Sequence, residues 1–294
     1  MKQEKLKGIT RCLLCFVLTV AGMFIVMVLF SVVANLSGNK FLMNLLNGGQ
    51  KEPILSAFAK LIMTILQYVA FIMVPILLAT KAWKYKIADM GLTPIKKDWK
   101  DFVIGLITGA AGISIAFLCL ILSGSIQLTG WSFRYVNCVM IELVCYIIVG
   151  FGEEIFFRGA LMLSLKRIGN KRLVVILTSA IFAAMHLGNN GITVFAFGNL
   201  FLFGLFAAFC FIRSKNIWLP IGFHITWNFV QGNIYGFHVS GNTDYSLVSQ
   251  KVVKETAFTG GEFGPEGGIG VTIALILCII FAMWYYRKQP KTDF

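Results

Sequence analysis

Two glutamates and an arginine lie together within a long apolar stretch of the sequence. The segment GFGEEIFFRGAL carries Glu153, Glu154 and Arg158. Ionisable groups at membrane depth usually mark a functional site, because burying them is costly. Glu154 and Arg158 are four residues apart with the acid first, so we expect them to pair on one helix face. Glu153 points about 100° away from that pair.

A carboxylate without a partner in a low dielectric favours its protonated form, which suits a general base that takes a proton from water. We therefore interpret Glu153 as a candidate general base, with Glu154 and Arg158 as its support. The alternative is a structural ion network of all three side chains.

Two histidines follow in later apolar runs. His186 ends the segment FAAMH, four residues after Phe182, and His224 begins HITWN, four residues before Asn228. Residues at this spacing share a helix face. His224 and Asn228 can donate hydrogen bonds to a developing oxyanion, or His224 can bind a metal. The alternative is packing and interhelical hydrogen bonding, which polar residues in membrane helices commonly provide.

These three clusters lie at a similar depth along their helices. We count from the basic residue that bounds each apolar run: Glu153 is 13 residues from Lys166, His186 is 14 from Arg172, and Asn228 is 13 from Lys215. At about 1.5 Å per residue, each group lies roughly 20 Å from the cytoplasmic boundary. Three helices are thus expected to present a base, an imidazole and an amide at one level.

The composition shows which solvent surrounds these helices. Hydrophobic residues make up 57% of the 294 residues and charged residues 13%, and the mean hydropathy is +0.79. Too few charged residues are present to cover a soluble domain of this size. The net charge of +13 does not indicate nucleic-acid binding, because the basic residues fall between apolar runs and form no basic stripe or arm.

Apolar runs bounded by charged residues, Gly or Pro predict an all-α fold, a polytopic membrane helix bundle with about eight transmembrane helices. We expect one transmembrane domain over residues 1–294, with a motif-bearing core at about 135–235 and an external loop at about 236–267. The expected spans are about 9 to 34, 54 to 80, 102 to 124, 135 to 162, 172 to 187, 192 to 212, 219 to 235 and 268 to 286.

The basic residues also predict the orientation in the membrane. With eight spans and both termini cytoplasmic, almost every connection that carries Lys or Arg lies inside, as the positive-inside rule requires. The connections expected outside hold only Lys40, Lys51, Arg134, Lys251 and Lys254. We therefore predict a multi-pass integral membrane protein, located in the plasma membrane if the chain is bacterial.

Glu142 and the seven cysteines also lie in or beside the apolar runs, and each has an interpretation other than catalysis. Glu142 lies eleven residues before Glu153, on nearly the same helix face, where it either lines the cavity or bonds locally. A transporter that uses both glutamates as a proton relay is disfavoured, because the sequence shows no repeated halves. The seven cysteines lie in or beside apolar runs and are interpreted as small buried hydrophobic residues, with no disulfide framework.

The three clusters, in this order, resemble the motifs of the CPBP family of intramembrane peptidases. That family is named for CAAX proteases and bacteriocin processing and is also called the Abi family. Its motifs are EExxxR, FxxxH and HxxxN or HxxxB, and the match covers residues 150 to 230. The matching positions are Glu153, Glu154, Arg158, Phe182, His186, His224 and Asn228.

The resemblance implies an all-helical membrane endopeptidase. Glu153 and His186 would prime a water molecule, and Glu154 with Arg158 would orient the site. His224 and Asn228 would stabilise the tetrahedral intermediate. Family members are often called metalloproteases, and Glu153, His186 and His224 offer three ligands to a divalent metal such as zinc. The sequence has no HExxH motif, however, and we favour the metal-free glutamate mechanism.

The expected partners are a membrane-associated protein or peptide substrate and the lipid bilayer, with no nucleic acid. CAAX-type processing and removal of leader peptides are both open. The alternative to an enzyme is a non-catalytic membrane protein on the same scaffold, serving bacteriocin self-immunity or the regulation of a sensor kinase.

Overall fold

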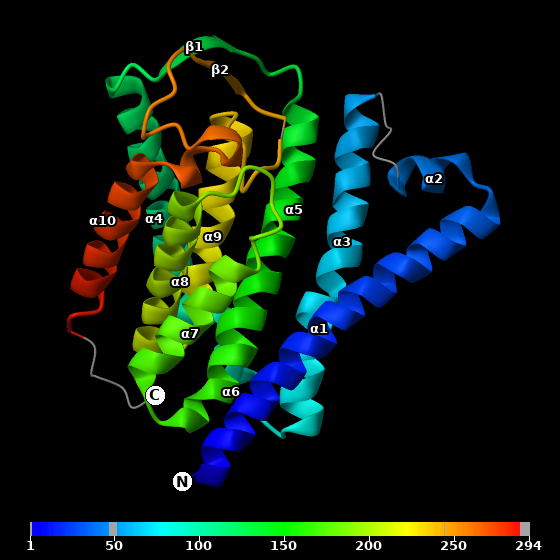
Figure 1. Cartoon of the computed structure of the whole chain (residues 1–294), viewed down its shortest axis with the longest axis vertical. Helices are drawn as coiled ribbons and strands as arrows, with labels where there is room; N and C mark the ends of the chain where they lie inside the picture. Colours follow the sequence, from blue (N-terminus) through cyan, green and yellow to red (C-terminus); the bar gives the residue numbers. More distant parts are fainter. Residues whose placement is uncertain (1, 47–51, 244, 289–294) are drawn as a thin grey trace.

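The computed structural model describes residues 2–46, 52–243 and 245–288. Helices dominate this part of the chain (Figure 1). The long ones are α1 (Lys2–Ser37), α3 (Pro53–Leu77), α4 (Ile95–Leu122), α5 (Val136–Glu154), α7 (Lys171–Ala184), α8 (Val194–Ser214), α9 (Trp218–Phe229) and α10 (Ile269–Tyr285). The short helices are α2 (Lys40–Leu46) and α6 (Leu163–Leu165).

Each of the eight expected apolar runs coincides with a helix, so the all-α membrane helix bundle is confirmed. Among the described residues, four helices are long and apolar enough to cross a membrane: Lys2–Ser37, Pro53–Ala82, Ile87–Leu122 and Val194–Ser214. With 14 and 12 residues, α7 and α9 are shorter than the roughly 20 residues of a full crossing. Eight crossings therefore stay a prediction.

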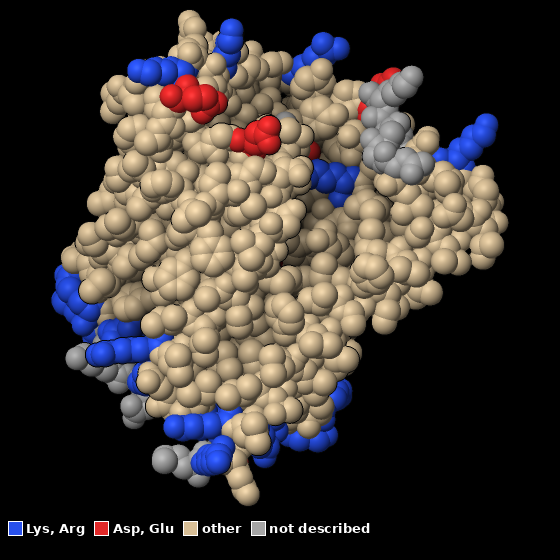
Figure 2. All heavy atoms as spheres, viewed as in Figure 1, with Lys and Arg blue, Asp and Glu red and all other residues tan. Residues whose placement is uncertain are grey.

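Charges gather at the two ends of the molecule. Figure 2 shows a broad uncharged surface between them, with the acidic residues of this view only at the end that carries the strands. At the other end, Arg167 pairs with Glu4, and Arg213 donates to the backbone oxygen of Tyr286. The start of α1 and the end of α10 therefore lie toward the same end of the bundle. The side of the membrane on which these helix ends lie stays a prediction. Lys51, one of the basic residues expected on the outside, falls outside the described residues.

Glycines allow α4 to pack directly against the backbone of α9. A Cβ atom on Gly105 would lie 2.2 Å from the backbone oxygen of Leu219, and one on Gly109 would lie 2.3 Å from that of Phe223. From the opposite side, a Cβ on Gly222 would lie 2.4 Å from the oxygen of Phe102. Small residues let membrane helices approach this closely. This contact fixes the position of α9, the helix that carries His224 and Asn228.

The segment expected as an external loop has structure of its own. Strand β2 (Val248–Val252) pairs antiparallel with β1 (Ile126–Trp131), which lies between α4 and α5. Two short 3-10 helices follow, η6 (Gly261–Phe263) and η7 (Pro265–Gly267), directly before α10. In Figure 1 this orange segment and the two strands lie at one end of the bundle.

Candidate active site

Glu153 lies in the last turn of α5 and faces α3. Its Oε1 atom accepts a hydrogen bond of 2.7 Å from the Tyr68 hydroxyl. Its Oε2 atom is buried and has no hydrogen-bond partner among the described residues. The Nε2 atom of His224 lies 3.8 Å from Oε2, beyond direct hydrogen-bond distance. One carboxylate oxygen is thus held, and the other remains available to a small molecule such as water.

Glu154 is fully buried and joins α5 to α9. Its Oε1 atom accepts hydrogen bonds from Nη1 of Arg158 and from Nδ1 of His224, both at 3.1 Å. The pair expected between Glu154 and Arg158 is present, although the chain changes to the π-helical segment η3 (Ile155–Met162) directly after Glu154. Short π-helical segments within α-helices often occur at functional sites.

The second Arg158 nitrogen extends the network to α8. Nη2 donates to the backbone oxygen of Gly204 at 3.3 Å, and the guanidinium lies 5.0 Å from the centre of the Phe182 ring. Arg158 is itself 1% exposed. Because a buried charge is tolerated when it is paired and hydrogen-bonded, this network lets one cation and one carboxylate stay within the bundle.

His186 lies beyond the end of its helix, not on it. The apolar run was expected to continue to about residue 187, but α7 ends at Ala184 and His186 is in the turn that follows. Two glycines and two asparagines over 188–191 explain this end, because both residue types favour helix termination. The Nδ1 atom of His186 donates to the backbone oxygen of Phe182 at 2.9 Å, which leaves Nε2 as the acceptor of a neutral ring.

A cavity of about 530 Å³ brings the expected residues together. Its walls include Glu153, His186, His224 and Asn228, from α5, the turn after α7, and α9. Tyr68 from α3 and Glu266 from η7 also line it. Glu154 and Arg158 do not line this cavity; they support it from behind. The arrangement offers a free carboxylate oxygen, two imidazoles and an amide to one bound molecule.

Glu142 lies outside this cavity and has a local role. Its carboxylate forms an ion pair of 3.2 Å with Lys60 and accepts hydrogen bonds from the Asn233 amide and the backbone nitrogen of Tyr245. It therefore ties α3, the π-helical segment η5 (Val230–Ile234) that follows α9, and the external segment to α5. Of the two expectations for Glu142, local bonding is the one observed.

The side chains expected as metal ligands do not form a metal site. Among the described residues, no group of three or more His, Cys, Asp or Glu side chains is arranged to hold a metal ion. His224 Nε2 lies 3.8 Å from Glu153 Oε2, while Nδ1 of His224 is committed to Glu154. The expected set of Glu153, His186 and His224 therefore does not form a ready three-ligand site in the described part of the chain.

Tyr68 is a site residue that sequence reasoning missed. A signal was present, because Lys60, Thr64 and Tyr68 recur every four residues in a largely apolar helix and thus share one face. All three line the cavity.

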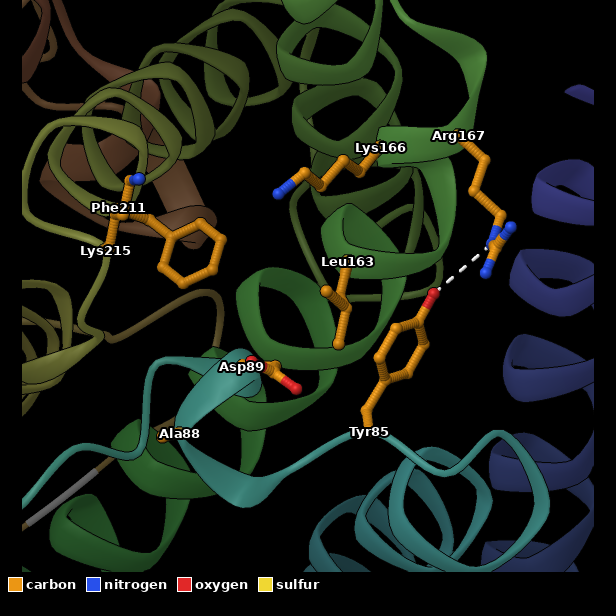
Figure 3. A pocket seen from close by; sticks show the side chains of 8 residues that line it. All are labelled: Tyr85, Ala88, Asp89, Leu163, Lys166, Arg167, Phe211 and Lys215. Atoms are coloured by element: carbon orange, nitrogen blue, oxygen red, sulfur yellow. Dashed lines mark hydrogen bonds between the residues drawn. The ribbon is translucent and has the colours of Figure 1, made fainter. Parts of the chain in front are cut away.

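A second cavity, of about 640 Å³, lies at the other end of the bundle and contains none of the motif residues. Figure 3 shows Lys166, Arg167 and Lys215 at its rim, with Arg167 hydrogen-bonded to the Tyr85 hydroxyl. Asp89 faces the same space. Although it is larger, this cavity has no base or nucleophile beside an imidazole, so the candidate active site is the smaller one.

The fold and the site define a class of protein, a membrane helix bundle with carboxylates, imidazoles and an amide around one internal cavity. A family model described as Rce1-like, type II CAAX prenyl endopeptidase Rce1-like, matches residues 135–230. This span runs from the start of α5 to the end of α9 and includes all six motif residues with chemistry. The resemblance to the CPBP family is thereby confirmed, and the match supports an intramembrane endopeptidase. No curated protein and no solved structure matches the chain.

Proposed function

We propose that this protein is an intramembrane endopeptidase that hydrolyses peptide bonds of membrane-associated proteins or peptides with a water molecule activated by Glu153. The observation that carries the proposal is the buried Oε2 atom of Glu153, which lacks a partner among the described residues and faces His224 across 3.8 Å. A water molecule at this position is within reach of both groups.

Glu153 acts as the general base. The Tyr68 hydroxyl holds Oε1, so Oε2 takes the proton as the water oxygen attacks the carbonyl carbon of the substrate. When the carbon–nitrogen bond of the tetrahedral intermediate breaks, the same proton passes to the leaving amine. Glu153 thereby returns to its ionised form, and the atoms and charges of the reaction balance.

His186 assists at the same water. Its Nδ1 proton is committed to the Phe182 carbonyl, so Nε2 carries a lone pair that can accept a hydrogen bond from water. Fixing one ring nitrogen on the backbone selects this tautomer and orients the ring.

His224 and Asn228 stabilise the oxyanion. Glu154 accepts the Nδ1 proton of His224, which holds the ring with Nε2 on the side of Glu153. A protonated Nε2 and the Asn228 amide are hydrogen-bond donors to the negative oxygen of the intermediate. Arg158 donates to the same Oε1 atom of Glu154 that accepts from His224, so the whole arrangement is formed before substrate binds.

We propose that this chemistry proceeds without a metal, since the chain's own residues supply the base, the second water contact and the oxyanion donors. The substrates we propose are CAAX-type or leader-bearing polypeptides held at the membrane, which agrees with the name of the matched family.

The function is tested by comparing the membrane peptides of cells that make wild-type protein, Glu153→Ala or His186→Ala at equal abundance. Peptides cut in the wild type should stay uncut in both variants. Processing retained in either variant would overturn the proposal, and a phenotype that survives both substitutions would favour a non-catalytic role in immunity or in sensor-kinase regulation.

A further inference from the structure

The cavity of about 640 Å³ at the end of the bundle opposite the strands has a basic lining (Figure 3). Among the described residues, it shares no lining residue with the catalytic cavity. Leu163 and Phe211 form part of its apolar wall. Three cations and one acid also line it, a net charge of +2: Lys166, Arg167, Lys215 and Asp89. The cavity therefore combines positive charge with an apolar surface.

Two segments that are distant in the sequence bring the cations together. Lys166 and Arg167 begin η4 (Lys166–Ile168), and Lys215 follows the last residue of α8. Figure 3 shows the Lys166 side chain extending toward the side of the cavity that holds Lys215, while Arg167 turns toward Tyr85. The positive groups therefore surround a space, and do not form a row along one helix.

The backbone of Lys215 has a conformation that favours glycine. Its φ is 58°, in the left-handed region, which a Cβ atom makes unfavourable. Lys215 ends α8, and glycine is the usual residue at such a helix end. The chain thus has a cation beside the cavity at a position where glycine would fit the backbone better.

Two guanidinium groups meet at the Tyr85 hydroxyl. Its oxygen accepts hydrogen bonds from Nε of Arg167 at 3.3 Å and from Nη1 of Arg11 at 3.2 Å. Arg167 also pairs with Glu4, and the guanidinium of Arg11 lies 5.4 Å from the centre of the Trp83 ring. Arg11 thereby offsets the charge of Glu4. Because the arginines use the lone pairs of the phenol oxygen, the phenol proton is left to donate to a bound anion.

These groups match the chemistry of a phosphate group. A phosphate monoester carries a charge of roughly −1.5 to −2 near neutral pH and has three strong acceptor oxygens. The cavity offers the opposite net charge, with an arginine fork and two lysines, the side chains that most often bind phosphate. Basic pockets between membrane helices bind the phosphate of lipid headgroups. The apolar wall can contact the remainder of such a lipid.

The positive-inside rule alone predicts basic residues at a membrane boundary. It accounts for exposed lysines such as Lys96, which lies near the start of α4 and does not line the cavity. The rule does not require cations from two segments to line one cavity. It also does not require Arg11 and Arg167 to share one acceptor. The arrangement at this cavity therefore points to a bound anion.

We propose that this cavity is a binding site for a phosphate group, carried by a membrane lipid or free in solution. Lys166, Arg167 and Lys215 are its cationic ligands, and the Tyr85 hydroxyl is a further donor. Asp89 opposes binding; its Oδ2 atom accepts a hydrogen bond from a backbone nitrogen at the start of η2 (Ile87–Met90). The proposal does not depend on the proposed function.

The first experiment titrates the purified full-length protein in detergent by calorimetry. The probes are short-chain phosphatidic acid, phosphatidylcholine with the same chains, and inorganic phosphate. Phosphatidic acid should bind at least tenfold more tightly than phosphatidylcholine, whose choline neutralises the phosphate. Equal binding of inorganic phosphate assigns the site to free phosphate, and binding of phosphatidic acid alone assigns it to a lipid headgroup. Absence of binding by both anions up to millimolar concentration would overturn the proposal.

The second experiment repeats the titration with variants of the lining. Lys166→Gln and Lys215→Gly should each weaken binding of the anion about tenfold, because each removes a charged hydrogen-bond donor. Lys215→Gly should be no less stable than the wild type, since glycine fits its φ. Asp89→Asn should strengthen binding about threefold, because it removes the opposing charge and keeps an oxygen for the backbone.

The matched control is Lys96→Gln, which removes one charge outside the cavity and should bind as the wild type does. An equal loss of affinity in Lys96→Gln and Lys215→Gly would overturn the proposal, because the overall charge of +13 would then account for binding. Affinities that are unchanged in all the lining variants would also overturn it. If Lys166→Gln does not accumulate, Lys215→Gly and Asp89→Asn still decide, because they must change the affinity in opposite directions.

Discussion

Glu154 accepts a hydrogen bond of 3.1 Å from Nδ1 of His224, a residue 70 positions later in the chain. The same oxygen also accepts a hydrogen bond from Arg158, so one buried carboxylate joins the first and third motifs. Glu154 is thus the central residue of a buried hydrogen-bond network, and Glu153 is left to face the cavity. Two adjacent glutamates have different tasks because successive side chains of a helix point in different directions.

The two hydrogen bonds that Glu154 accepts predict a large loss of stability in Glu154→Ala. Removing this acid leaves the Arg158 guanidinium, 1% exposed, without its ion-pair partner. Breaking one side of a buried pair costs about 3–5 kcal/mol. Denaturant unfolding in detergent should show this loss, while Glu262→Ala, at an exposed site, should unfold as the wild type does. Equal unfolding of both variants would contradict the role assigned to Glu154.

The contact between Tyr68 and Glu153 predicts a kinetic effect. Tyr68→Phe removes the hydroxyl that binds Oε1 but keeps the ring, which lies 5.3 Å from that of Phe71. We expect kcat to fall about tenfold, equivalent to about 1.4 kcal/mol in the barrier, with little change in stability. Tyr235→Phe is the control, because it loses a hydroxyl contact with Ser114, outside the cavity. Equal kcat values for the two variants would argue against a role for Tyr68 in the site.

The packing of α4 on α9 predicts opposite effects for two Gly→Ala substitutions. Gly109→Ala places a Cβ 2.3 Å from the Phe223 oxygen and should destabilise the protein by about 1–3 kcal/mol. In α8, Gly198→Ala meets nothing within 4 Å and should be stabilising by about 0.5–1 kcal/mol. Thermal unfolding of both variants measures this difference, and a shift of the same sign in both would refute the close α4 and α9 contact.

The metal-free mechanism predicts that chelators leave cleavage unchanged. Purified protein incubated with 1,10-phenanthroline and then separated from it should retain its full rate, and its metal content should be far below one ion per chain. The contrary result is a rate that is lost with the metal and restored by added zinc. That result would assign Glu153 and His224 to a metal and require ligand movements from the present arrangement.

Much of the fold follows from the apolar pattern of the sequence, because every long apolar run became a helix. The pairing of Glu154 with Arg158 is also local, since it depends only on helical spacing. The contact of Tyr68 with Glu153 could not be predicted, because spacing gives the face of a helix and not the helix that it meets. The end of α7 at Ala184 could not be predicted to the residue, because the apolar run continues to Leu187.

The place of Glu266 in the cavity wall could not be predicted for a similar reason. The segment TGGEFGPEGG has two glutamates, and composition does not distinguish the exposed Glu262 from the buried Glu266. The structure distinguishes them, because Glu266 accepts hydrogen bonds from Ser240 and Asn199.

The most direct test of the central claim is the single-turnover rate of peptide cleavage by purified Glu153→Gln. This substitution keeps the size of the side chain and an oxygen for the Tyr68 hydroxyl, but removes the base. The rate should fall by about 10²–10⁴-fold, with unfolding and substrate binding as in the wild type. Cleavage at the wild-type rate by the folded variant would contradict the assignment of Glu153 as the group that activates water.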